Sequence, residues 1–425
     1  MRRNIVLLLA SIFTSSAAAL AGVTALGKLV YDITGRDLFL GFLGLAEFSP
    51  ALLLVLITGH VADRFDRRRV TAVAALAEGV VALALAAYAG SSPTAVAPIF
   101  FLVVCFGVAR AFVAPASRSI PADTVPAERL PWLTARFSAA WQASIVVGPV
   151  LGGTLYAVDP KWPFIAMAVL LVISALCVSA IRIDSNRRVT APEVARVLEA
   201  GVAPVLGDID VAVADADADD ARGMRGALEG LRFIRGHPVL LGAISLDLFA
   251  VLFGGAVALL PAIAQDRLGA GAVGLGWLRA AGGIGAGAVT AVLAFRPLQR
   301  HVGRVLLVSV ATFGVFTILL GVTRSYFVAF AALAVLSGAD AMSVFVRATL
   351  VPLVTPADRR GRVLAVENVF IGASNELGAF ESGVVGEIIG SSGAIVLGGV
   401  ATLAVAITWA TAFPALREVD RFPRS

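Results

Sequence analysis

Long apolar stretches separated by short polar segments run through almost the whole chain. A helix crosses about 30 Å of hydrocarbon with about 20 residues, and the stretches lack the alternation of polar and apolar positions that barrel strands show. Because backbone polar groups in lipid must be satisfied within the segment, the pattern predicts twelve transmembrane helices. They lie at roughly 5–31, 38–61, 70–90, 94–117, 132–157, 162–181, 239–263, 272–295, 304–322, 325–349, 363–389 and 393–414.

One long polar segment divides these helices six and six. Its acidic run from Gly207 to Asp220 has too few large apolar residues to fold alone, so we expect it to be disordered. The stretch from Ala227 to Arg235 is amphipathic and predicts a helix on the inner membrane surface. The predicted units are a six-helix bundle (1–181), a cytoplasmic linker (182–237), a second six-helix bundle (238–416) and a cytoplasmic tail (417–425).

The two halves repeat each other in sequence. A shift of 230 residues places Pro126–Arg129 (P-A-E-R) on Pro356–Arg359 (P-A-D-R). The same shift pairs Gly153 with Gly383. Six-helix halves related by a parallel repeat are one architecture of secondary transporters, in which substrate binds near the midplane between the halves.

Composition agrees with a membrane protein and argues against a soluble one. The chain is 59% hydrophobic and 15% charged, with a mean hydropathy of +0.90, whereas soluble domains are about 45–50% apolar and about 25% charged. The net charge of +5 could suit nucleic acid, but the arginines form short blocks between apolar stretches, so no nucleic-acid partner is expected. Loops on one side hold most of them. This predicts an inner-membrane protein with both termini in the cytoplasm, and the opposite loops hold only Arg36, Lys161, Arg267 and Arg324.

A charged motif connects the second and third stretches: residues 59–69 read G-H-V-A-D-R-F-D-R-R-R. The glycine allows close approach of a neighbouring helix, and the first aspartate can pair with an arginine or with a helix N-terminus. The basic residues can hold the loop in place ionically. The motif predicts a conformational latch, with a plain topology loop as the alternative, and its residues are Gly59, Asp63, Arg64, Arg67 and Arg68.

A second motif lies in the fifth stretch, where residues 144–153 read S-I-V-V-G-P-V-L-G-G. Small residues permit tight helix contact, and the proline removes one backbone hydrogen bond and bends the helix. The pattern predicts a hinge that seals one face of a pathway, and a simple packing face is the alternative. Its residues are Ser144, Gly148, Pro149, Gly152 and Gly153.

The eleventh stretch is unusually polar for a membrane helix. Two acids near its centre cost roughly 5–7 kcal/mol if glutamate resembles aspartate, so the helix must face protein or water on part of its surface. At 100° per residue, one arc of about 140° collects six polar residues and predicts a cavity wall. Glu376 falls outside this arc and needs its own partner. The six are Glu367, Asn368, Ser374, Asn375, Glu381 and Ser382.

Other charges lie within the predicted membrane region. We interpret the set as a hydrated path, although a structural ion pair is equally open for each member. Arg118 and Arg347 lie at matching inner ends of the fourth and tenth stretches and are candidate latch partners of Asp63. The candidate proton and substrate path consists of Asp247, Asp340, Asn375, Glu376, Glu381 and Arg110, and its carboxylates are the candidate proton carriers.

These motifs resemble those of the major facilitator superfamily. The loop motif is similar to the family's loop signature, with Asp66 replacing the usual glycine, and residues 144–153 resemble the antiporter signature, with Ser144 replacing its first glycine. Further segments resemble the branch with the bacterial enterobactin exporter and macrolide-efflux proteins: 245–249 with 259–261, 274–281 and 369–383. The resemblance implies the major facilitator fold and proton-driven alternating access. It further implies export of a siderophore- or drug-like solute, and we expect the protein to be a monomer.

Other function classes remain as alternatives. An importer or a lipid flippase would share the fold. A membrane-embedded transferase needs a catalytic cluster on a sizeable loop, and a receptor needs a folded soluble domain; neither is apparent, so we do not expect an enzyme. No cofactor or metal is expected, because the Gly282–Gly287 run lies inside an apolar stretch, Cys105 and Cys177 sit in apolar surroundings, and the three histidines are scattered.

Overall fold

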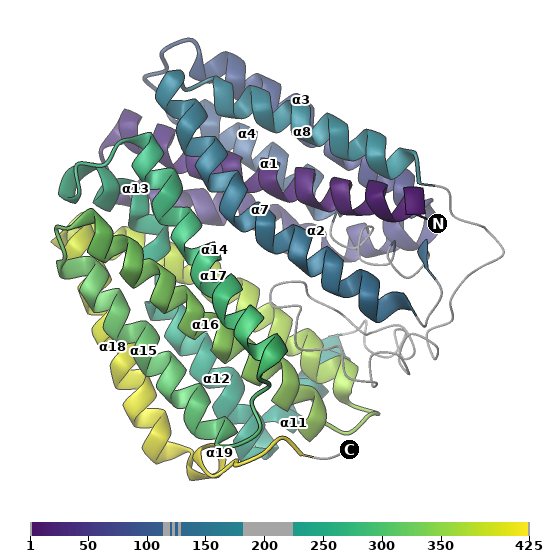
Figure 1. The fold of residues 1–425 in the computed structure, drawn as a ribbon, viewed down its shortest axis with the longest axis vertical. Helices are drawn as coiled ribbons and strands as arrows, with labels where there is room; N and C mark the ends of the chain where they lie inside the picture. The colour runs from purple at the N-terminus through teal and green to yellow at the C-terminus, as the bar shows by residue number, and fades with distance from the viewer. Residues whose placement is uncertain (1, 114–119, 121–123, 126–128, 182–223, 424–425) are drawn as a thin grey trace.

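A computed structural model describes residues 2–113, 120, 124–125, 129–181 and 224–423, and all the regular structure among them is helical (Figure 1). The first half contains α1 (Arg2–Thr34), α2 (Asp37–Arg64), α3 (Arg67–Ala89), α4 (Ala97–Ala111), α7 (Leu130–Val158) and α8 (Trp162–Ser179). The second half contains α11 (Met224–Gly236), α12 (Pro238–Phe253), α13 (Leu260–Ala262), α14 (Ala272–Phe295), α15 (Val302–Val322), α16 (Tyr326–Val354), α17 (Arg360–Ile389), α18 (Ser391–Ala412) and α19 (Pro414–Arg417).

The predicted twelve-helix architecture is confirmed. Ten segments of the described chain are long and apolar enough to cross a membrane, if Pro238–Arg267 is taken as one. The helix α4 is apolar but shorter, at 15 residues, and α17 has the length but is more polar than the others. These two bring the number to twelve.

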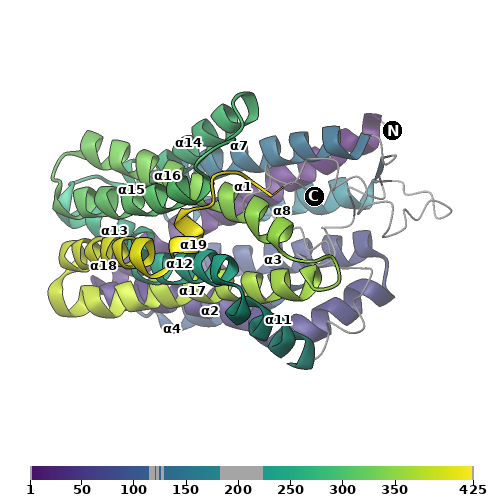
Figure 2. The same ribbon diagram turned by 90° about the horizontal axis from the view of Figure 1, so that it is seen from below.

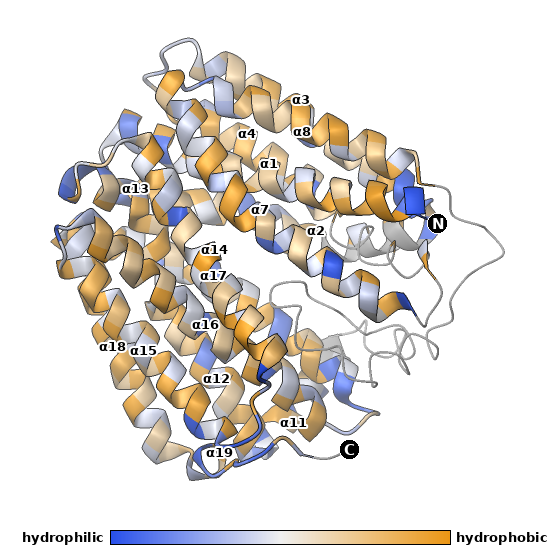
Figure 3. Ribbon diagram, in the orientation of Figure 1, coloured by the Kyte–Doolittle hydropathy of each residue, from blue (hydrophilic) through white to orange (hydrophobic). Residues whose placement is uncertain are grey.

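The surface of the bundle is that of a protein in lipid. Large apolar side chains are widely exposed on the outside of the helices, as at Phe295 (87% exposed) and Phe327 (82%). Hydrophilic residues gather toward the helix ends (Figure 3). Water would not tolerate so much exposed apolar surface, whereas lipid stabilises it.

The helices form two groups that lie side by side (Figures 1 and 2). In the first half α1 packs against α7 and α8, and in the second half α15 packs against α16 and α18. The halves meet along two helix pairs, α2 with α17 and α7 with α14. We call the end that holds the start of α1 and the end of α18 the terminal end. The far end holds the α1–α2 connection at Gly35 and the α17–α18 connection at Gly390.

The seventh predicted span is interrupted, whereas the sequence predicted one continuous helix over 239–263. The helix α12 ends at Phe253, and a 3₁₀ turn (Gly255–Leu259), α13 and a π-helical turn (Ile263–Arg267) follow. Gly255 lies so close to α17 that a methyl group on it would stand 2.2 Å from the carbonyl oxygen of Gly378. The backbone at Gly255 thus lies against α17 directly after the end of α12.

The predicted amphipathic helix forms as α11, but protein covers part of its apolar face. Ile234 is 1% exposed, Gly230 lies against the backbone of Arg362 in α17, and Nη1 of Arg362 donates to Glu229 at 2.6 Å. Part of the apolar face therefore packs on α17 and α12, whereas Leu228 is 55% exposed, and the position of α11 on the membrane surface stays a prediction. The rest of the predicted linker, residues 182–223, lies outside the described residues.

Candidate functional site

Glycines bring the two halves into close contact. In the α2–α17 pair, a methyl group on Gly383 would stand 2.9 Å from the Cα of Gly41. In the α7–α14 pair, a methyl group on Gly153 would stand 2.3 Å from the carbonyl oxygen of Ala272. Side chains at these positions would separate the helices, so the small residues set the distance between the halves.

The motif of residues 144–153 contacts both halves. Ser144 Oγ donates to the carbonyl oxygen of Phe13 in α1 at 3.1 Å, and a methyl group on Gly152 would stand 2.5 Å from the carbonyl oxygen of Ala21 in the same helix. On another face, the carbonyl oxygen of Pro149 lies against Gly276 of α14. The helix α7 thus packs tightly on α1 within its half and on α14 of the other half. We call the contact between the halves, along the α2–α17 and α7–α14 pairs, the seam.

Replacing Gly152 by alanine is expected to lower the stability of the protein by about 1–3 kcal/mol, because the added carbon meets backbone that cannot step aside. Thermal unfolding of the purified protein in detergent measures the effect. Gly79→Ala in α3 is the matched control, since its new carbon would lie at an ordinary contact distance of 3.8 Å from the carbonyl oxygen of Ala168. Equal losses in the two variants would contradict a tight α1–α7 contact.

Polar side chains join the halves at the far end. Lys28 Nζ donates to Oε1 of Gln265 at 2.8 Å, and the Tyr31 hydroxyl donates to Asp266. Arg36 Nε donates to Oε1 of Glu387 at 2.7 Å. Close by, Ser391 Oγ donates to Oδ2 of Asp37 at 2.6 Å. These contacts come from both α1 and α2 of the first half, and they tie that end of the seam together.

A buried ionic cluster connects three helices of the second half. Arg347 of α16 contacts Asp247 of α12 at 2.7 Å and Glu367 of α17 at 3.6 Å. The three side chains are only 5%, 6% and 7% exposed. Buried charges of this kind must be paired, so the cluster holds the second half together. It also places Arg347, predicted as a latch partner of Asp63, beside the predicted carrier Asp247.

A second group of charges surrounds Glu47 of α2 and draws on both halves. Glu47 interacts electrostatically with Glu78 of the first half, and with Arg279 of α14 and Glu376 of α17 in the second. Arg110 of α4, a predicted path residue, interacts with Glu78. Acids and arginines at this depth are expensive in a membrane, and here they meet where the halves touch.

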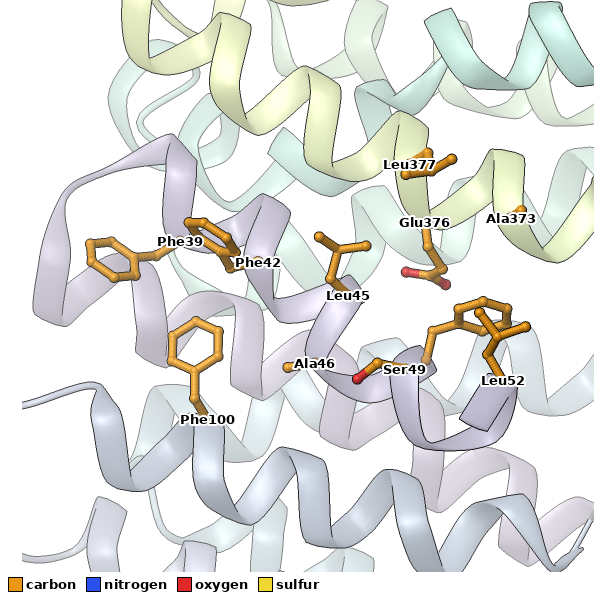
Figure 4. A pocket seen from close by; sticks show the side chains of 11 residues that line it. Phe39, Phe42, Leu45, Ala46, Ser49, Leu52, Phe100, Ala373, Glu376 and Leu377 are labelled. Carbon is orange, nitrogen blue, oxygen red and sulfur yellow. The ribbon is translucent and has the colours of Figure 1, made fainter. Parts of the chain in front are cut away.

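An apolar recess of about 610 Å³ lies along the α2–α17 pair. We call it the α2–α17 recess. Glu376 is its one ionisable side chain, and Figure 4 shows this carboxylate pointing from α17 toward α2, between Leu45 and Ser49. The recess is lined by Phe39, Phe42, Leu45, Ala46, Phe48, Ser49 and Leu52 of α2, Phe100 of α4, and Ala373, Glu376 and Leu377 of α17.

Solved transporters share this architecture along nearly their whole length. A POT family transporter in complex with 5-aminolevulinic acid aligns with a TM-score of 0.70 at 10% identity, covering 97% of this chain and 96% of that one. The nucleoside transporter NupG aligns with a TM-score of 0.67 at 14% identity, over 98% and 99% of the two chains.

Sequence comparison decides the family. The profile described as "Major Facilitator Superfamily" matches residues 6–303, more than half of the chain. This chain belongs to the Major Facilitator Superfamily. A profile described as "Transmembrane secretion effector" matches residues 205–425 of this facilitator. The multidrug efflux pump Tap of Mycolicibacterium fortuitum is 25% identical to it over 438 residues, covering 99% of this chain and 98% of Tap. Membership, predicted from the two motifs, is confirmed.

The loop motif of this facilitator is only partly described. The surroundings of Gly59, the side chain of Asp63 and all of Arg118 lie outside what the structure describes. Asp66 caps α3 by accepting from the backbone N–H of Arg68 at 3.0 Å. Arg68 also donates to Asp66 at 2.8 Å and to the carbonyl oxygen of Ile181 at 2.6 Å, and its hydrogen bonds lower the pKa of the Asp66 carboxyl.

The polar arc predicted on α17 of the facilitator does not form one cavity wall. Glu367, Ser374 and Ser382 are buried inside the second half, Glu367 in the ionic cluster. Asn375 is exposed and donates to the carbonyl oxygen of Ile371 at 3.0 Å. Glu376, which the wheel left outside the arc, faces the other half. The surroundings of each side chain depend on the neighbouring helices, and the angular positions of residues around a single helix do not include these neighbours.

The remaining path residues of the facilitator differ in their surroundings. Asp340 and Glu381 are half-buried, and the Glu381 carboxylate is hydrogen-bonded to the Ser382 side chain. The sequence analysis missed Glu78, which is 2% exposed, and the far-end acids Asp37 and Asp266. An acid within an apolar stretch was the available signal for Glu78, whereas the far-end pairs join residues more than 200 positions apart.

Proposed function

We propose that this major facilitator protein exports a small organic molecule in exchange for protons, by alternating access between its two halves. The convergence of Glu47, Arg279 and Glu376 at the seam carries the proposal. Half-buried charges contributed by both halves respond to any relative motion of the halves. A single chain is sufficient for this mechanism, because both halves that meet at the seam belong to one molecule.

The arginine distribution supports a cytoplasmic position for both termini in the inner membrane. The far end then faces outward. The contacts of Lys28, Tyr31 and Arg36 with the second half close this outer end. Export requires that these contacts break and that contacts at the terminal end replace them. The latch of Asp63, Arg64, Arg67 and Arg68 belongs to that end by its position in the sequence.

Proton coupling is assigned to the membrane carboxylates. A neutral acid and an ionised acid stabilise different arrangements of the halves, because burial penalises the charged form. Glu376 is the strongest candidate, since it sits on the seam itself. Glu381 and Asp340 are partly exposed candidates on the second half. Asp247 is paired with Arg347 at 2.7 Å, so protonation there would act through the ionic cluster.

The proposed direction of transport and the proposed class of solute rest on similarity to other proteins. A relative named as a multidrug efflux pump aligns along the full length, and residues 144–153 resemble the antiporter signature. Both support an exporter of drug-like or siderophore-like molecules over an importer. The described helices leave only short far-end connections, which supports a transporter over a membrane-embedded enzyme.

Proteoliposomes with an imposed pH gradient test the proposal. We expect erythromycin, ethidium or enterobactin to release protons through the wild-type protein, and glucose to release none. In Glu376→Gln this release should fall by about tenfold or more, the equivalent of one lost charge interaction of about 1.4 kcal/mol. Full proton exchange in Glu376→Gln, Glu381→Gln, Asp247→Asn and Asp340→Asn alike would refute the carboxylate assignment. No release with any of the three solutes would refute the export function.

A further inference from the structure

The α2–α17 recess faces the membrane rather than the interior of the bundle. Three of its lining side chains are strongly exposed on the outer surface: Phe42 (40%), Leu52 (54%) and Leu377 (50%). On α2, Phe42 and Leu52 each lie about 140° around the helix from Glu47. A molecule dissolved in the lipid can therefore reach the recess directly from the side.

The walls of the recess suit an aromatic or branched apolar body. Phe39 and Phe100 lie with ring centroids 6.1 Å apart, and Phe42 lies 5.2 Å from the ring of Phe380. A guanidinium already stacks on one of these rings, since Arg36 lies 5.5 Å from the centroid of Phe39. Aromatic faces of this kind attract organic cations.

Glu376 gives the recess a negative charge that the protein does not balance. Within the described part of the chain, its carboxylate has neither a hydrogen-bond donor nor a cation as partner. Its oxygen Oε2 lies against Gly44, where a methyl group would stand 2.4 Å away. The charge that acts on it most is another acid, Glu47. In such surroundings the carboxyl group stays neutral unless a cation from outside accompanies its charge.

We propose that the α2–α17 recess is a membrane-facing binding site for a lipophilic organic cation, with Glu376 as its counter-ion. The volume of about 610 Å³ lies in the range of sites for drug-sized molecules. The proposal rests on the export function above and names the solute class for it. Cation and proton would compete for one carboxylate, so that binding of the solute displaces the proton.

Equilibrium binding of tetraphenylphosphonium to the full-length protein in detergent tests this site, and tetraphenylborate provides the same shape with the opposite charge. We expect the wild type to bind the phosphonium and Glu376→Gln to bind it at least about tenfold more weakly, as for a lost ion pair of about 1.4 kcal/mol. Tetraphenylborate should not lose affinity in this variant. A lipid chain as the natural occupant would make both ions bind alike, which would overturn the proposal.

A second variant tests the recess without altering its charge. Ser49→Phe fills the space beside Glu376 and should weaken phosphonium binding by a similar factor. Ile407→Phe, at a lipid-facing position of α18 that is 67% exposed, is the matched control and should bind as the wild type does. Unchanged binding in both Glu376→Gln and Ser49→Phe would overturn the site. Binding needs no pH gradient, so this result stands apart from a failure of proton exchange in the proteoliposomes.

Discussion

Replacing Arg347 by methionine is expected to destabilise the protein by about 3–5 kcal/mol, because two buried acids lose their shared cation. Asp247 lies 2.7 Å and Glu367 3.6 Å from the guanidinium. Methionine fills a similar space but cannot compensate either charge. Since the cluster ties α12, α16 and α17 together, the loss should spread over the second half rather than stay local.

Thermal unfolding in detergent, followed by size-exclusion chromatography, measures this effect. Removing the acids as well, in the triple variant Arg347→Met, Asp247→Asn and Glu367→Gln, should restore much of the stability, since no uncompensated charge remains. Arg69→Met, at an exposed position, controls for the loss of an arginine. An Arg347→Met protein that unfolds like the wild type would show that the cluster does not stabilise the fold.

The architecture could be predicted from the sequence because the lipid bilayer restricts the length and the composition of the helices that cross it. A helix must be long and apolar to cross the membrane, so the lengths of α1, α3 and α15 follow from their composition. The repeat between the halves and the central polar segment then predicted two six-helix groups, as the structure has them. The helix α17 could be placed as well, because residues 363–389 are long enough to cross the membrane and are largely apolar despite their acids.

Side-chain partners could not be predicted in the same way. Asp247 and Arg347 are 100 positions apart, and their 2.7 Å contact depends on how α12 packs on α16. The wheel placed Glu367 correctly on a polar face of α17 but could not show that the face turns into the second half. Glu376 looked isolated on the wheel because its surroundings belong to α2, in the other half. The break after Phe253 likewise results from contact with α17.

Cross-linking the far end across the seam is expected to stop transport almost completely. Arg36 and Glu387 come from opposite halves and are joined by a 2.7 Å ion pair, so cysteines at both positions will lie within reach of a short cleavable bis-maleimide. Alternating access requires this end to open in each cycle. We expect the initial rate of solute-driven proton release to fall by about tenfold or more and to recover when the linker is cleaved.

The control pair occupies the same end of the molecule but one half. Arg267 Nη1 donates to Ser392 Oγ at 2.8 Å, and both residues belong to the second half. Cysteines at these two positions should cross-link with little loss of transport, because the halves stay free to move against each other. Both series are built on a chain in which Cys105 and Cys177 are replaced by alanine. Full transport by the cross-linked Arg36–Glu387 pair would exclude opening of this end as a step of the cycle, whereas equal inhibition of both pairs would assign the effect to local damage.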